Sequence, residues 1–167
     1  MKTISIIIMF LSLVTGNSFA GEQNKVTKRQ RQQEQSEKIQ RLVEANDYTF
    51  VAQRAVPMGG NSIHLSSNYD LKVGNDAIAA YLPFYGRAYS APMNNTEGGI
   101  RFESMDFDYK IEPAKKDGWD AHITARDGIK RYDMILRITS SGSAFLTVIE
   151  NTRQNITFNG YIEERKK

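Results

Sequence analysis

The segment Leu82–Met93 holds the densest set of side chains that could bind a ligand. It places Phe84, Tyr85, Arg87 and Tyr89 around Gly86, between two prolines. Rigid aromatic walls and one guanidinium group can hold a carboxylate, a phosphate or a sugar hydroxyl. The same residues can also build a packed corner between two sheets, and composition favours this second interpretation. For a barrel or sandwich that binds a ligand, the residues predicted at the mouth of the binding site are Tyr81, Tyr85, Arg87, Tyr89 and Trp119.

A pair of carboxylates is the best candidate for catalysis. Asp106 and Asp108 stand two positions apart on a predicted strand, so their side chains project from one face roughly 6 to 7 Å apart. Hydrolases use carboxylate separations in this range. However, Lys110 and Glu112 continue the same polar side, which is typical of a solvated strand face. A hydrolase is therefore a remote alternative, and no residue is predicted to be catalytic.

Metal and thiol chemistry have little support. The two histidines, His64 and His122, lie on separate predicted strands without HxH or HxxxH spacing. There is no cysteine, which excludes disulfides, thiol catalysis and iron–sulfur ligation. No G-x-S-x-G sequence marks a nucleophilic serine. The sequence predicts neither a metal site nor a cofactor.

The N-terminus has the pattern of a cleavable secretory signal. Lys2 precedes an apolar run from Ile4 to Val14, and Ser18-Phe19-Ala20 supplies small residues before a cleavage point. The run is too short to span a bilayer stably, and no later apolar run reaches the length of a membrane helix. We therefore expect residues 1–20 to be removed and the mature protein to be periplasmic or secreted.

The charge distribution argues against a nucleic-acid partner. The region from Asn46 onward carries fifteen basic and fifteen acidic residues, so it is neutral. A nucleic-acid groove needs clustered Lys and Arg that follow the phosphates. The cluster Lys28–Arg31 is a candidate for weak contact with anionic surfaces, although a solvated helix face is the favoured interpretation.

Residues 21–46 are predicted to form a polar helical or partly disordered segment. Gln23–Ala45 lacks Gly and Pro and is rich in Gln, Glu, Lys and Arg, which favours helix. Only Ile39, Leu42 and Val43 give an apolar stripe, so the second half can dock while the first half is expected to fray.

Residues 47–167 are predicted to form a single antiparallel β domain. Alternating apolar residues and turn residues every eight to twelve positions are typical of a barrel or sandwich. The loops are too short for crossover helices, so neighbouring strands should pair antiparallel. The fold class is therefore mainly β, a meander forming a small barrel or two-layer sandwich after an N-terminal helix. The expected strands are Tyr48–Ala55, Ser62–Leu65, Tyr69–Val73, Ala77–Leu82, Ile100–Glu112, Trp119–Arg126, Tyr132–Thr139, Ala144–Glu150 and Asn155–Glu163.

Several blocks resemble an uncharacterised family of exported proteins from Gram-negative bacteria, the domain-of-unknown-function family DUF4251. The blocks are Tyr48–Ala52, Pro57–Gly60, Leu82–Pro92, Gly98–Phe102, Gly142–Leu146 and Arg153–Gly160. In the most specific block the family pattern has Tyr then Phe, whereas this sequence has Phe84 then Tyr85. The resemblance implies export and one β-rich domain, and it transfers no activity.

Two function classes lead. The first is a non-catalytic binding module that encloses a small apolar or amphipathic ligand, which requires an internal cavity with some polar groups. The second is a cell-envelope interaction protein that docks a protein partner through its helix or a sheet edge, which requires a filled core and an exposed patch or edge. The aromatic content slightly favours the first class.

Overall fold

The computed structural model describes residues 20–87, 89 and 98–166, with side chains from residue 27 onward. Residues 1–19 of the predicted signal and part of the Leu82–Met93 block therefore lie outside the described residues. One helix, α1 (Ala20–Glu44), precedes the strands. The strands are β1 (Tyr48–Pro57), β2 (Ile63–Val73), β3 (Ile78–Pro83), β4 (Gly99–Ser104), β5 (Phe107–Pro113), β6 (Trp119–Asp127), β7 (Lys130–Ile138), β8 (Ser143–Glu150) and β9 (Arg153–Glu164).

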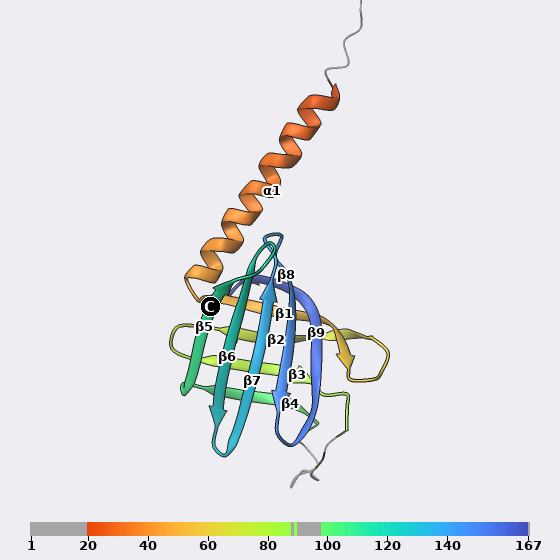
Figure 1. The fold of residues 1–167 in the computed structure, drawn as a ribbon, viewed down its shortest axis with the longest axis vertical. Helices are drawn as coiled ribbons and strands as arrows, with labels where there is room; N and C mark the ends of the chain where they lie inside the picture. Colours follow the sequence, from red (N-terminus) through yellow and green to blue (C-terminus); the bar gives the residue numbers. More distant parts are fainter. Residues whose placement is uncertain (1–19, 88, 90–97, 167) are drawn as a thin grey trace, which may run out of the picture.

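The strands form one antiparallel sheet in the order β4-β3-β2-β1-β9-β8-β7-β6-β5. Each strand therefore pairs with its sequence neighbour, except that β4 and β5 are not paired and β1 pairs with β9. Figure 1 shows β5 to β9 running across β1 to β4, so that the sheet folds over itself into two crossing layers. The predicted antiparallel meander is confirmed, and it takes the form of a nearly closed barrel.

The pairing of β1 with β9 joins the first strand to the last. A bulge between Ala52 and Arg54 shifts the register on β1 and increases its local twist. Opposite the bulge, Gly160 approaches β1 so closely that an added Cβ would lie 1.9 Å from the carbonyl oxygen of Val51. Only glycine permits this backbone contact, because any side chain would collide with the carbonyl.

The predicted single strand Ile100–Glu112 is wrong, because the chain turns a corner between β4 and β5. The Ser104 hydroxyl lies 2.9 Å from the carbonyl oxygen of Asp106 and 2.5 Å from that of Arg126, so its one proton bridges the two strands at the corner. Met105, which the regular alternation of a single strand would turn toward the core, is 83% exposed at this turn. Further along β5, the hydroxyl groups of Tyr109 and Tyr48 lie 3.1 Å apart. Burial raises the pKa of both phenols, so this pair stays protonated at neutral pH.

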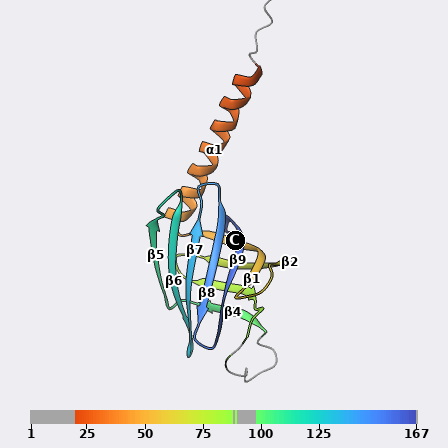
Figure 2. The same cartoon turned by 45° about the vertical axis from the view of Figure 1, so that its right-hand side comes forward.

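The last two turns of α1 dock on one end of the barrel, as Figure 2 shows. Ile39 and Val43 are buried, and Leu42 packs against the same cluster. Ile39 fits because Gly142, with a φ of 90°, has no side chain, and an added Cβ would lie 2.8 Å from Cδ1 of Ile39. The helix ends where Asn46 adopts a left-handed φ of 50°, a common C-terminal capping conformation. Within the described residues, no helix is long and apolar enough to cross a membrane.

The described interior is filled by side chains from both layers. Phe102 of β4 stacks on Tyr132 of β7 with ring centroids 4.3 Å apart. Tyr48, Phe50 and Phe158 are fully buried in the same core cluster. Aromatic residues therefore occupy the space between the layers that the binding-module hypothesis assigned to a ligand.

We expect Gly160→Ala to lower the free energy of unfolding by roughly 3 kcal/mol, because the new methyl group must push β9 away from β1. The exposed Gly98 has no atom within 4 Å of an added Cβ, which makes Gly98→Ala a matched control. Urea unfolding followed by circular dichroism measures both variants. Equal stability of the two variants would contradict the role given to Gly160.

Candidate functional site

The five residues of the predicted ligand mouth lie in three different places. Tyr81 points outward from β3, and Tyr85, Arg87 and Tyr89 are exposed in the segment after it. Trp119 begins β6 and packs, half-buried, against the core. Their role in ligand binding stays a prediction, but the structure does not gather all five around one opening.

The segment after β3 and Trp119 lie at opposite ends of the barrel. The backbone N–H of Tyr89 donates to the carbonyl oxygen of Thr152, in the β8–β9 hairpin, at 2.8 Å. Trp119 pairs with Ile138, at the end of β7 that leads into the β7–β8 hairpin. These two hairpins are at opposite ends of β8, so a single ligand mouth cannot include both sets of residues.

A buried ion pair supports the segment after β3. Glu150 is buried, with Arg153 Nε 2.9 Å from its Oε2 and the Thr152 hydroxyl 2.5 Å from its Oε1. Oε2 makes no aligned hydrogen bond, so we assign its contact with the guanidinium to charge attraction. The same guanidinium covers the ring of Phe84 and donates to the carbonyl oxygen of Gly99. These contacts are those of a packed corner, the interpretation that composition favours.

The two candidate catalytic carboxylates, Asp106 and Asp108, both form ion pairs with Arg126. Arg126 Nη1 lies 2.9 Å from Asp106 Oδ1, and its Nη2 lies 2.9 Å from Asp108 Oδ2. Each carboxylate is exposed and bound to a cation, which makes it a poor general base.

His64 on β2 and His122 on β6 are both exposed and belong to strands that are not neighbours. Among the described residues, no group of three or more ligating side chains is placed to hold a metal ion.

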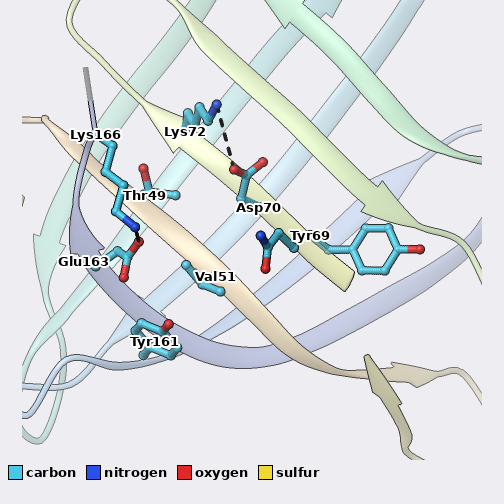
Figure 3. Close-up of a pocket in the computed structure, with 9 residues that line it drawn as sticks. Thr49, Val51, Tyr69, Asp70, Lys72, Tyr161, Glu163 and Lys166 are labelled. Carbon is cyan, nitrogen blue, oxygen red and sulfur yellow. Dashed lines mark ion pairs between the residues drawn. The ribbon is translucent and has the colours of Figure 1, made fainter. Parts of the chain in front are cut away.

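A groove of about 300 Å³ lies on the outer face of β1, β2 and β9 (Figure 3). The strand register builds it from three rows of side chains. Thr49 lies between Lys72 and Glu163, and Val51 lies between Asp70 and Tyr161. β1 therefore supplies the floor, and β2 and β9 supply the walls. The lining residues are Thr49, Val51, Asn68, Tyr69, Asp70, Lys72, Tyr161, Glu163 and Lys166.

The groove carries equal numbers of positive and negative side chains. Lys72 Nζ lies 3.9 Å from Asp70 Oδ2, and Lys166 Nζ lies 3.8 Å from Glu163 Oε1. Partial burial raises the pKa of Asp70, and the nearby ammonium group of Lys72 only partly offsets this shift. A desolvated carboxylate in a groove is a common feature of binding and catalytic sites.

An aromatic cluster continues the groove along β2 and β3. Tyr81 pairs in register with Asp70, and its ring stacks on Tyr69 with centroids 5.3 Å apart. The Tyr69 ring itself points away from the floor of the groove (Figure 3). Arg101 lies over the Tyr81 ring, and its Nη2 donates to the Tyr81 hydroxyl at 3.1 Å. Tyr81 is thus the member of the predicted mouth that lies on the same outer face as the groove.

Sequence reasoning missed most of this groove. Its two walls come from Asn68–Lys72 and Tyr161–Lys166, about ninety positions apart in the chain. The alternation of side chains along each strand indicates which residues share a face. It does not reveal that β9 pairs with β1, and that pairing brings the two walls together.

Comparisons with known proteins give a family but no activity. No curated protein matches the chain. A crystal structure of a DUF4251 family protein from Bacteroides eggerthii DSM 20697 is similar in fold, with a TM-score of 0.60 and 14% sequence identity. The match covers 78% of this chain and 87% of that one. The family model described as "Domain of unknown function (DUF4251)" matches residues 30–162. The chain therefore belongs to the DUF4251 family.

Proposed function

We propose that this protein is a non-catalytic binding domain that holds a neutral, hydroxyl-rich ligand, a saccharide, in the groove on β1, β2 and β9. The observation that carries the proposal is the lining of the groove, in which two carboxylates and two ammonium groups surround a floor of Thr49 and Val51. A hydroxyl group donates to a carboxylate and accepts from an ammonium group, so a polyhydroxylated ligand can satisfy both. A ligand with a net charge gains nothing from a balanced lining.

The aromatic side chains support the same class of ligand. Tyr161, 37% exposed, forms part of one wall, and Tyr81 lies beyond the other wall. The C–H face of a sugar ring is apolar and can pack against such a ring while its hydroxyls meet Asp70, Asn68 and Glu163. A groove of about 300 Å³ is at the small end for ligand sites, which suits one or two sugar units at a time.

The apolar ligand expected from the sequence has less support than a polar one. The described interior is packed with aromatic side chains, and the groove on the outer face is mostly polar. An envelope protein partner docked on α1 also has less support, because residues 27–38 of the helix are all polar and offer no apolar stripe.

The place of action is part of the proposal. The charged start, the apolar run Ile4–Val14 and the small residues before Gly21 support export to the periplasm or the medium. Intact mass measurement of the protein purified from its native host tests this directly. A chain beginning at Gly21 agrees with the proposal, and an uncleaved chain in the cytoplasmic fraction contradicts it.

Saccharide binding is tested by calorimetry with maltotetraose, cellotetraose and chitotetraose as probes. We expect at least one probe to bind with a Kd of about 1 mM, as an open site with few contacts allows. Tyr161→Ala should weaken that binding about tenfold, because it removes the stacking wall. Tyr89→Ala is the matched control, since this exposed tyrosine lies at one end of the barrel, in contact with the β8–β9 hairpin. Absence of binding by all three probes, or an equal loss in both variants, would overturn the proposal.

Asp70→Asn should weaken saccharide binding and yet stabilise the fold at pH 7. The pKa of Asp70 is raised in the folded state, so its protonated form contributes stability below the usual value of 3.8. That contribution is lost as the pH rises through the folded-state pKa. A neutral amide avoids the cost, and we expect Tm to rise by roughly 2 °C at pH 7.

The pH dependence of Tm identifies the cause of this stabilisation. The difference between Asp70→Asn and the natural chain should shrink as the pH falls toward 3, where Asp70 is protonated in both states. Asp76→Asn is the matched control, because it makes the same change at an exposed position outside the groove. A Tm difference for Asp70→Asn that does not depend on pH would show that desolvation of its carboxylate is not the cause.

A further inference from the structure

Two adjoining clefts lie at the end of the barrel where α1 meets the β7–β8 hairpin. The first, of about 410 Å³, separates the helix from the hairpin and is lined by Lys28, Arg31, Gln32, Gln35, Ser140 and Ser141. The second, of about 610 Å³, lies on the other side of the same hairpin and is lined by Ala114, Lys115, Lys116, Asp117, Asp120, Arg137 and Thr139. The Ser140 hydroxyl donates to Asp117 across the boundary, so the two clefts share one wall.

The two clefts carry an excess of positive charge. Together they present five basic side chains and two carboxylates. Arg137 Nε binds Asp120 Oδ1 at 2.8 Å, so one of the carboxylates is neutralised locally. In the part of the chain that the structure describes, Lys28, Arg31, Lys115 and Lys116 take part in no ion pair. This end of the molecule is basic, whereas the chain from Asn46 onward is neutral as a whole.

The basic groups come from two separate parts of the fold. Lys28 and Arg31 lie three positions apart, so they share one face of the helix. That face is turned toward the hairpin, because Gln35, one turn further on, donates from its Nε2 to the Ser141 carbonyl oxygen. Lys115 and Lys116 come from the loop between β5 and β6. The docked end of α1 thus fixes the distance between the two sets of cations.

We propose that this pair of clefts binds a phosphate-bearing ligand. A guanidinium group presents paired N–H donors that match phosphate oxygens, and lysines add point charges. A cleft with an excess of positive charge also concentrates anions, because its low-dielectric walls focus the field. The two clefts share no residue with the groove on β1, β2 and β9, so phosphate binding is tested independently of saccharide binding.

The phosphate can belong to a free molecule or to a lipid headgroup, and two probes distinguish these sources. The soluble probe is tripolyphosphate, titrated into the full chain at 20 mM salt and followed by calorimetry. The membrane probe is a vesicle of phosphatidylcholine with phosphatidylglycerol, followed by co-sedimentation, with pure phosphatidylcholine vesicles as the uncharged reference. Binding should weaken strongly at 300 mM salt, because exposed charges are screened.

Three variants test whether the clefts are the site. Lys28→Gln with Arg31→Gln removes both positive charges of the first cleft, and Lys115→Gln with Lys116→Gln removes two of the three positive charges of the second. Each double variant should weaken binding about tenfold or more, since hydrogen bonds to charged groups are among the stronger ones. Arg54→Gln is the control, because this exposed arginine of β1 lies outside both clefts. Thermal unfolding of each variant confirms that the fold is retained.

Each result of these experiments either supports or overturns the proposal of phosphate binding. Salt-sensitive binding of tripolyphosphate that both double variants weaken supports the proposal with a soluble ligand. Binding to anionic vesicles alone, with the same losses, supports it with a lipid headgroup. Absence of binding to either probe at low salt overturns it. A loss that Arg54→Gln reproduces also overturns it, because general surface charge then explains the binding.

Discussion

The antiparallel pairing of β1 with β9 is the interaction on which the rest of the structure depends. A meander of consecutive hairpins leaves its first and last strands as unpaired edges, which invite aggregation. Here those two strands pair with each other, and the free edges move to β4 and β5, at the corner bridged by Ser104. The pairing requires the bulge at Ala52–Arg54 and the close approach of Gly160 to Val51. The same pairing forms the groove, because it places Glu163 and Tyr161 across β1 from Lys72 and Asp70.

Because side chains fill the interior, the candidate binding sites of this protein lie on its outer surface. Small barrels can hold a ligand inside only where the inward side chains leave room. In this protein the Phe102–Tyr132 stack and the buried rings of Tyr48, Phe50 and Phe158 occupy that room. The outer face offers a charge-balanced groove on β1, β2 and β9, and the helix end offers two basic clefts. Partial burial raises the pKa of Asp70 in this groove, a shift that is common at binding sites.

Local features of the chain were predictable, and contacts between distant segments were not. The end of the helix near Asn46, the hairpin turns and the antiparallel meander all follow from short-range turn chemistry. Apolar and polar residues alternate through Met105 regularly enough to predict one continuous strand. The chain instead turns there, where the Ser104 hydroxyl contacts the carbonyl oxygen of Arg126, more than twenty positions away. The groove depends on pairing between residues about ninety positions apart, which periodicity cannot reveal. The residues of the predicted ligand mouth lie apart for the same reason, because Tyr81 belongs to β3 and Trp119 to β6.

Mapping the bound ligand by nuclear magnetic resonance tests the central claim, that the outer groove is the binding site. Amide chemical shifts of the isotopically labelled protein are recorded while the tetrasaccharides are added in turn. The account predicts that the shifts that change belong to Thr49, Val51, Asn68–Lys72 and Tyr161–Glu163, with Tyr81 at their border. Changes confined to Tyr85–Tyr89 or to the interior residues around Tyr132, or no changes at all, would contradict it.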